Sequence, residues 1–160
     1  MTGLDSVDAR ILLALDDDPD ATILALSRRL GLARNTVHAR LSKLAARDLL
    51  GKPSRRIDPA VLGYTLLAFV TLSITQDAPV VTTQALERIP EVLEVHAITG
   101  QGDLLARVVA RDAADLYRLT TKILEIEGVD HASTTLAMVE IIPSRMGPLL
   151  ERHATDPAAG

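Results

Sequence analysis

The densest group of side chains that could do chemistry lies between residues 26 and 56. This stretch holds nine Lys and Arg residues against one acidic residue, Asp48, a local excess of eight positive charges. A stripe of this density attracts a polyanion, because each phosphate that it neutralises releases condensed counterions. Basic stripes also occur on proteins that bind no nucleic acid, so the charge alone leaves both interpretations open.

Polar residues in this stretch share one face of a predicted helix over about residues 34–47. Val37, Leu41 and Leu44 repeat at helical spacing and form its apolar back. The outward face and its flanks carry no carboxylate, and amide, hydroxyl and basic groups there could contact base edges and phosphates in a major groove. These candidate DNA-binding residues are Arg34, Asn35, Thr36, His38, Arg40, Ser42, Lys43 and Arg47.

Two members of that set have an equally good alternative role. Arg40 could form an ion pair with Asp5 or Asp8 inside the domain, and His38 could be an ordinary exposed side chain. The helix pattern combined with the basic stripe is a stronger indication of DNA binding than either feature alone.

Three short helices are predicted to position this face. The first, over about residues 6–16, follows the capping residue Asp5, and the second follows Thr22. Gly31 then allows the positive φ of a tight corner before the helix over 34–47. The spacing of the second and third helices is that of a helix-turn-helix motif.

The sequence changes its period after residue 64. Strands are predicted over 65–75, 92–99, 104–110 and about 131–142, and helices over 79–89 and about 112–126. The order βαββαβ is ferredoxin-like, with two helices on one face of a four-stranded antiparallel sheet. Apolar residues also occupy the other face, which no predicted helix covers, so we expect a self-association surface there.

We therefore predict an α+β fold with two domains. An N-terminal three-helix helix-turn-helix domain occupies residues 1–50, and a linker strand over residues 51–63 joins it to a ferredoxin-like βαββαβ domain over 64–142. Residues 143–160 are predicted to be a C-terminal tail that packs only briefly, through Leu149 and Leu150.

Composition excludes several classes of function. There is no cysteine, hence no disulfide and no thiol nucleophile, and the four histidines have neither metal-ligand spacing nor the partners of a catalytic triad. We expect no enzyme activity, no catalytic residue, no cofactor and no metal. Only Tyr64, Phe69 and Tyr117 are aromatic, too few for the stacking platforms of single-strand binders, so duplex DNA is the expected nucleic acid.

The expected compartment is the cytoplasm, in association with the nucleoid. No apolar run approaches the roughly 18 residues that a membrane span requires, so we expect no membrane partner. The N-terminal residues MTGLDSVD also lack the basic region of a secretory signal.

Several segments carry motifs in one register. Residues 4–12 read LDSVDARIL, residues 58–63 read DPAVLG and residues 90–103 read PEVLEVHAITGQGD. They resemble the motifs L-D-x-x-D-x-x-I-L, D-P-x-x-L-G and P-E-V followed by T-G-x-x-D of the Lrp/AsnC family, the leucine-responsive and asparagine-dependent regulators. The resemblance extends over about residues 4–142, and on it the chain is identified as a member of that family.

This resemblance implies a ligand-responsive transcription regulator of double-stranded DNA. Family members dimerise through the ferredoxin-like (RAM-type) domain, often assemble into octamers, and bind an amino acid or a small metabolite between dimers. A homodimer that assembles into an octamer is thus expected. The matching effector-binding positions are Thr99, Gly100, Gln101, Gly102, Asp103 and Thr134.

The chemistry of these positions suits an amino acid. Loop amides at Gly100 and Gly102 could donate to its carboxylate, and Asp103 could accept from its ammonium group. Alternatively, residues 100–103 are only a tight hairpin turn. They are not a nucleotide-binding fingerprint, because a strand and not a helix follows them.

Departures from the family pattern concentrate at the expected sites. Ala33 replaces a Ser that usually caps the recognition helix, and Gln101 and Gly102 replace a carboxylate and an aromatic ring in the loop. Ala132 replaces the first hydroxyl of a Thr pair. The effector site is therefore roomier, differently selective or absent. This leaves two other functions open: an architectural DNA organiser without an effector, and an amino-acid-binding module that regulates an enzyme through protein contacts.

Overall fold

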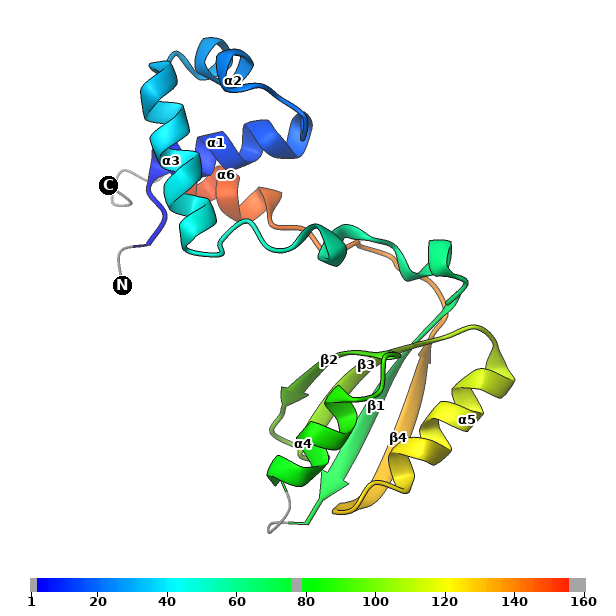
Figure 1. The fold of residues 1–160 in the computed structure, drawn as a ribbon. Helices are drawn as coiled ribbons and strands as arrows, with labels where there is room; N and C mark the ends of the chain where they lie inside the picture. The colour runs from blue at the N-terminus through cyan, green and yellow to red at the C-terminus, as the bar shows by residue number, and fades with distance from the viewer. Residues whose placement is uncertain (1–2, 76–78, 156–160) are drawn as a thin grey trace. The chain divides into compact units, whose positions relative to one another are not determined.

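The protein divides into two compact units, seen in a computed structural model that describes residues 3–75 and 79–155 (Figure 1). The first, which we call the head, contains Met1–Arg55 and Ile142–Gly160. The second, which we call the sheet unit, contains Arg56–Ile141. Within the described ranges, no helix has the length and apolar character that crossing a membrane requires.

Three helices form the N-terminal part of the head, as predicted: α1 (Ser6–Asp17), α2 (Ile23–Leu30) and α3 (Arg34–Ala46). The Asp5 side chain accepts a hydrogen bond from the Asp8 N–H at 2.9 Å, and the Asp8 side chain accepts from the Asp5 N–H in return. Thr22 caps α2 through the Ala25 N–H at 3.2 Å. Gly31 has φ 67°, the left-handed conformation that the corner before α3 requires.

The chain returns to the head at its C-terminal end. Helix α6 (Gly147–Thr155) packs along α1, and the His153 Nε2 donates to the Leu4 carbonyl oxygen at 2.6 Å. The region predicted to be a briefly packed tail therefore contains a helix of nine residues that belongs to the head. Its sequence offered little signal, because only Leu149 and Leu150 are apolar and large within it.

The linker contains no strand, and this part of the prediction is wrong. Residues 51–63 instead hold two short 3₁₀ helices, η1 (Pro53–Arg56) and η2 (Pro59–Leu62). Each begins with a proline, whose fixed φ suits the first turn of a helix and whose missing N–H cannot pair in a sheet. Asp58 caps η2 by accepting from the Ala60 N–H at 2.9 Å.

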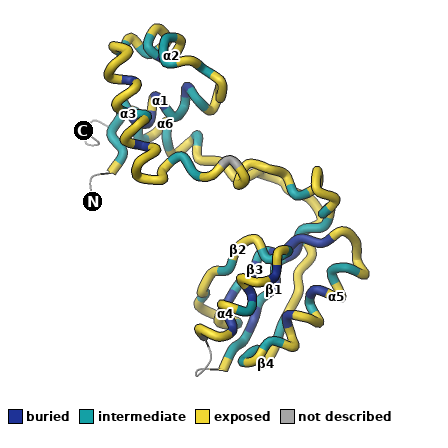
Figure 2. The backbone as a smooth tube through the Cα atoms, in the orientation of Figure 1, coloured by how far each residue is buried: buried dark blue, intermediate teal, exposed yellow. Residues whose placement is uncertain are grey.

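The sheet unit has the predicted βαββαβ order: β1 (Leu66–Ile74), α4 (Pro79–Glu87), β2 (Val92–Ala97), β3 (Leu104–Ala110), α5 (Ala113–Leu124) and β4 (Val129–Ala137). The strands pair antiparallel in the order β2-β3-β1-β4. Both helices pack on one face (Figure 2), where Val70 and Leu72 of β1 are buried with Leu86 and Leu119. Alternate burial along β1 and β3 produces this core.

The opposite face of the sheet carries the alternate residues of each strand. Leu67 and Phe69 of β1 and Leu105 of β3 lie there, only partly buried. Strand β4 begins and ends earlier than the predicted 131–142, because its last residue, Ala137, pairs with Leu67 at the start of β1. Beyond that pair, β1 has only one further residue, Leu66, so it cannot hold the predicted residues 138–142 in the sheet.

Candidate functional site

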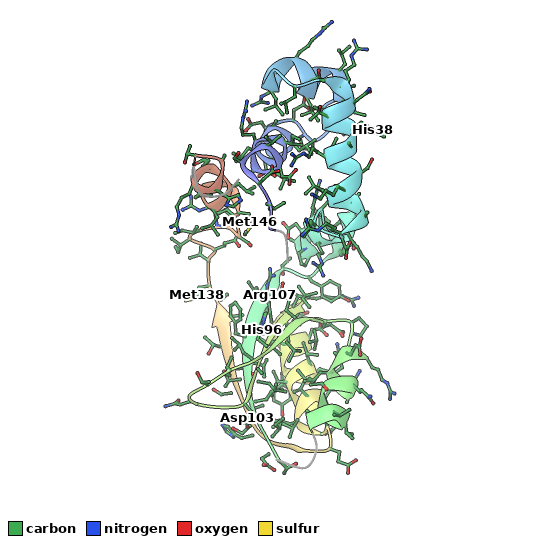
Figure 3. All side chains as sticks on the ribbon, turned by 90° about the vertical axis from the view of Figure 1, so that its left-hand side faces the viewer. His38, His96, Asp103, Arg107, Met138 and Met146 are labelled. Atoms are coloured by element: carbon green, nitrogen blue, oxygen red, sulfur yellow. The ribbon has the colours of Figure 1, made fainter. Side chains whose placement is uncertain are left out.

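The exposed face of α3 is the first candidate site. Its apolar back is buried, with Val37 fully inaccessible and Leu44 nearly so. This burial fixes the rotation of α3 about its own axis, so that its polar side chains face outward. Seven of the eight predicted DNA-binding residues are exposed: Arg34, Asn35, Thr36, His38, Ser42, Lys43 and Arg47. His38 lies on the side of α3 turned away from the other helices of the head (Figure 3).

Arg40, the eighth predicted residue, makes its described contacts inside the head. Its Nη1 donates to the Asp8 Oδ1 at 3.0 Å and also pairs with the Asp5 carboxylate. The Asp8 side chain is 2% exposed, against 29% for Arg40. Arg40 therefore has the alternative role considered above: its ion pairs join α3 to the start of α1.

Electrostatics at this junction favour the charged pair. Burial by itself raises the pKa of Asp5, but hydrogen bonds from Arg40 and from the Asp8 N–H outweigh it and hold that pKa below its ordinary value. The same hydrogen bonds, to Asp5 first and then to Asp8, raise the pKa of Arg40. Both groups are therefore ionised at neutral pH.

The start of α3 differs from the other capped helices of the head. Ala33 occupies the capping position and has no side-chain acceptor for the N–H groups of the first turn. No acidic side chain lies in that turn, and Arg34 is its first residue. The N-terminal end of α3 is thus electropositive, and this charge favours contact with a phosphate.

The loop between β2 and β3 is the second candidate site, and its aspartate has a structural role. The Asp103 Oδ2 accepts from the Ile74 N–H at 2.8 Å, and the Asp103 N–H donates to the Leu72 carbonyl at 2.8 Å. The Asp103 carbonyl also accepts from the Ile98 N–H at 2.9 Å. Asp103 therefore joins the loop to the end of β1. A sequence pattern does not reveal this role, because the partners are backbone groups distant in the chain.

The loop lies against β1 at Gly102. A Cβ on this residue would stand 2.6 Å from the Thr71 Cγ2 and 3.0 Å from the Leu72 carbonyl oxygen, and its φ is +106°. Gly100 has a similar φ of +111°, but a Cβ there would meet nothing within 4 Å. Glycine at 102 is thus required for both conformation and space, and at 100 for conformation alone.

We predict that Gly102→Ala destabilises the sheet unit by about 2 kcal/mol more than Gly100→Ala does, because only the first adds a clash to the shared backbone strain. Thermal unfolding of both variants measures the difference. Equal losses of stability would contradict the close approach of the loop to β1.

Thr134 and the loop do not form a single cluster within one chain. Thr134 is on β4 and pairs with Val70 of β1, so β1 separates it from the loop. Because Val70 faces the helices, Thr134 points to the same face of the sheet. Thr99, Gly100, Gln101 and Asp103 are exposed, and Gly102 is partly buried. A ligand that touches both the loop and Thr134 would therefore need groups from another molecule.

Cavities also open elsewhere on the described part of the sheet unit. One, of about 240 Å³, lies between η2 and the paired ends of β1 and β4, with Arg107 and Tyr64 in its wall. Another, of about 450 Å³, lies between α4 and the edge strand β2. Among the residues that the structure describes, no group of three His, Cys, Asp or Glu side chains could hold a metal ion.

Comparison with known proteins yields matches in both units. The model of the Lrp/AsnC ligand binding domain matches residues 67–146, and a winged helix-turn-helix DNA-binding model matches residues 4–50. The HTH-type transcriptional regulator FL11 of Pyrococcus horikoshii is 30% identical over 135 residues, which cover 84% of this chain and 89% of FL11.

Solved structures share the fold. A transcriptional regulator of Neisseria meningitidis in complex with L-Met superposes with a TM-score of 0.80 at 25% identity, covering 92% of this chain and 99% of that one. E. coli AsnC superposes with a TM-score of 0.82 at 23% identity, covering 91% and 99% of the two chains, and this second match bears on the fold alone.

Proposed function

Because this chain belongs to the Lrp/AsnC family, we propose that it is a sequence-specific transcription regulator whose DNA binding responds to an amino acid or a related small metabolite bound between dimers. Its relatives are helix-turn-helix transcriptional regulators with a ligand-binding domain.

One observation carries the DNA-binding part of the proposal: the buried back of α3 leaves an outward face without a carboxylate. Asn35, Thr36 and Ser42 have amide and hydroxyl groups that match base edges, while Arg34 and Lys43 stand beside them as phosphate contacts. In this division of roles, Arg40 acts from within the head by holding α3 on α1.

Selection from random duplexes, followed by anisotropy titration at two salt concentrations, tests this part. A regulator is expected to enrich one symmetric sequence, to prefer it over random duplex by at least about 10³-fold, and to lose affinity steeply as salt rises. Absence of any salt-dependent duplex binding would refute it and would favour the module that acts on an enzyme through protein contacts.

For the effector, the proposal rests on the loop over residues 99–103. Asp103 keeps one carboxylate oxygen, Oδ1, outside the hydrogen bonds described above, and the neighbouring glycine amides can approach a ligand closely. Because Thr134 lies across β1 from this loop, the complete site would form between copies of the chain. The relative from Neisseria meningitidis was solved with L-Met, which supports an amino acid as the class of ligand.

Thermal unfolding in the presence of each of the twenty amino acids tests this part. A ligand at 100 times its dissociation constant stabilises the folded protein by about 2.7 kcal/mol. The matched control is Asp103→Asn, which keeps an oxygen for the Ile74 N–H but removes the charge that an ammonium group requires. The wild type is expected to respond to a small set of amino acids and the variant to none.

A second function has its own supporting observation. Because Asp103 already holds the loop on β1, the loop is complete as a structural hairpin, and it lacks the carboxylate and the ring common in the family. An architectural DNA-binding protein without an effector would have these features. It would bind duplexes with little sequence preference and would show no stabilisation by any amino acid.

Assembly is proposed to use the uncovered sheet face, which places two heads on one dimer. Phe69 lies near its centre on β1, opposite Arg107 and Thr135 on the two neighbouring strands. We predict that Phe69→Asp abolishes self-association, because it removes an apolar ring from the interface and puts a charged carboxylate there that must lose its water, while Phe69→Leu retains it. Sedimentation velocity measures both and also distinguishes dimers from octamers. A wild type that sediments as a monomer would contradict the proposal.

A further inference from the structure

Helix α1 is covered on two sides, and the second side involves the C-terminal helix. Ala14 packs in the core of the head with Leu26 and Val37 of the other two helices, and Ile11 is fully buried. Ala9 is also fully buried, yet it lies about 200° round α1 from Ile11. Because α6 is the remaining helix that packs along α1 (Figure 1), it accounts for this second covered side.

The contact reaches the end of α1 that holds the recognition helix. His153 of α6 donates to the carbonyl of Leu4 at 2.6 Å. The next residue, Asp5, caps α1 and pairs with Arg40 of α3. The C-terminal helix and α3 are thus both attached at the N-terminal end of α1, one through a backbone carbonyl and the other through an ion pair.

Two stretches of chain therefore connect the head to the sheet unit. The first runs from the end of α3 at Ala46 to the start of β1 at Leu66, and the second runs from the end of β4 at Ala137 to the start of α6 at Gly147. Both stretches join the sheet at the same end of two neighbouring strands, β1 and β4, because Leu67 near the start of β1 pairs with Ala137 at the end of β4. The second stretch, residues 138–146, spans at most roughly 30 Å.

A second connection changes what the head can do. A domain on one flexible linker can turn about that linker and reach targets at many distances and rotations. Attachment at a second point removes much of this freedom, provided that α6 remains docked on α1. For a dimeric DNA reader, restricted heads accept only a narrow range of distance and rotation between two half-sites.

We propose that α6 is a positioning element for DNA recognition, which anchors the head a second time and makes the protein selective for the spacing between half-sites. The occupant of the second covered side of α1 is thus this chain's own C-terminal helix, and His153 is the positioning residue that fixes its end. This inference rests on the proposed function, since spacing has meaning only for a protein that reads DNA.

The most direct test lengthens the segment between β4 and α6 without removing α6. Six Gly and Ser residues inserted after Ser144 lengthen residues 138–146 and leave α6 free to dock, and the same six residues added after Thr155 are the matched control. Affinity is measured for three duplexes: one half-site alone, two half-sites at the selected spacing, and two half-sites moved apart by about five base pairs, half a helical turn.

The wild type and the control are expected to lose at least about tenfold in affinity when the half-sites are moved apart by half a turn. The insertion variant is expected to lose less than about threefold, while its affinity for one half-site stays unchanged. Retention of the full spacing penalty in the insertion variant would overturn the inference and leave the proposed function intact. Failure of the wild type to bind any duplex would overturn both.

Point substitutions give a second measurement. His153→Ala removes the hydrogen bond to Leu4, and Glu151→Ala, on an exposed position of the same helix, is its control. His153→Ala is expected to reduce the spacing penalty in the same direction as the insertion and to speed amide hydrogen exchange at the start of α1. An unchanged penalty together with unchanged exchange would remove His153 from the positioning role.

Discussion

Arg40→Ala is expected to destabilise the head by about 2 kcal/mol and to lower its melting temperature by roughly 10 °C. The substitution leaves the Asp8 carboxylate, 2% exposed, without the guanidinium 3.0 Å away. Breaking a fully buried pair costs about 3–5 kcal/mol, and the smaller value here reflects the partial exposure of Arg40 and Asp5. Differential scanning calorimetry of the full chain measures the effect.

Arg29→Ala is the matched control. Arg29 also pairs with an aspartate, Asp17, but both side chains are about half exposed or more. Its loss is expected to cost less than about 0.5 kcal/mol. At a temperature where Arg40→Ala remains folded, its salt dependence of DNA binding should equal that of the wild type. A reduced salt dependence would show that Arg40 contacts phosphate instead of holding α3.

Acid is expected to weaken the same junction. Asp5 has a pKa below its ordinary value in the folded head. A carboxyl group whose pKa is lowered on folding stabilises the folded state above its unfolded pKa of about 3.9, and this contribution disappears as the pH falls through the folded value. The loss of stability of the wild type below about pH 4 should therefore be smaller in Arg40→Ala.

Neutralising Arg34 and Lys43 together is expected to weaken binding to every duplex by about 100-fold at low salt. The plot of log affinity against log salt should lose about two units of slope, because each phosphate contact releases roughly one counterion. Sequence preference should change little, since base edges and not phosphates carry it. Anisotropy titrations at several salt concentrations measure both quantities.

The control pair for this measurement is Arg88→Ala with Lys122→Ala. Both residues are exposed on the sheet unit, so this variant loses the same charge away from α3. Its slope should equal that of the wild type. Two equally reduced slopes would mean that binding follows total charge, and the face of α3 would not be the DNA-binding surface.

Local chemistry in the sequence predicts most of the fold. The capping pairs at Asp5 and Thr22, the break at Gly31 and the alternation within β1 and β3 each act over a few residues, and the structure confirms the elements that they predict. The exposed face of α3 was predictable for the same reason, because its apolar back fixes the rotation of the helix.

Features that depend on distant partners were less predictable. Residues 138–142 look like strand but lie beyond the pair of Leu67 with Ala137, where β1 has only Leu66 left to face them. Helix α6 is short and has few apolar residues, and its packing on α1 is visible only in three dimensions. For Asp103 and Arg40, sequence suggested two roles each, and only the fold shows which partners they contact.

A hydroxyl-radical footprint of the full chain on a duplex selected from random sequence is the most direct measurement of DNA reading by paired heads. Two heads placed in successive major grooves should protect two patches on one side of the duplex, about 10 base pairs apart, and the variant lacking Arg34 and Lys43 should protect neither at the same protein concentration. A single protected patch, or uniform weak protection without regard to sequence, would contradict this arrangement.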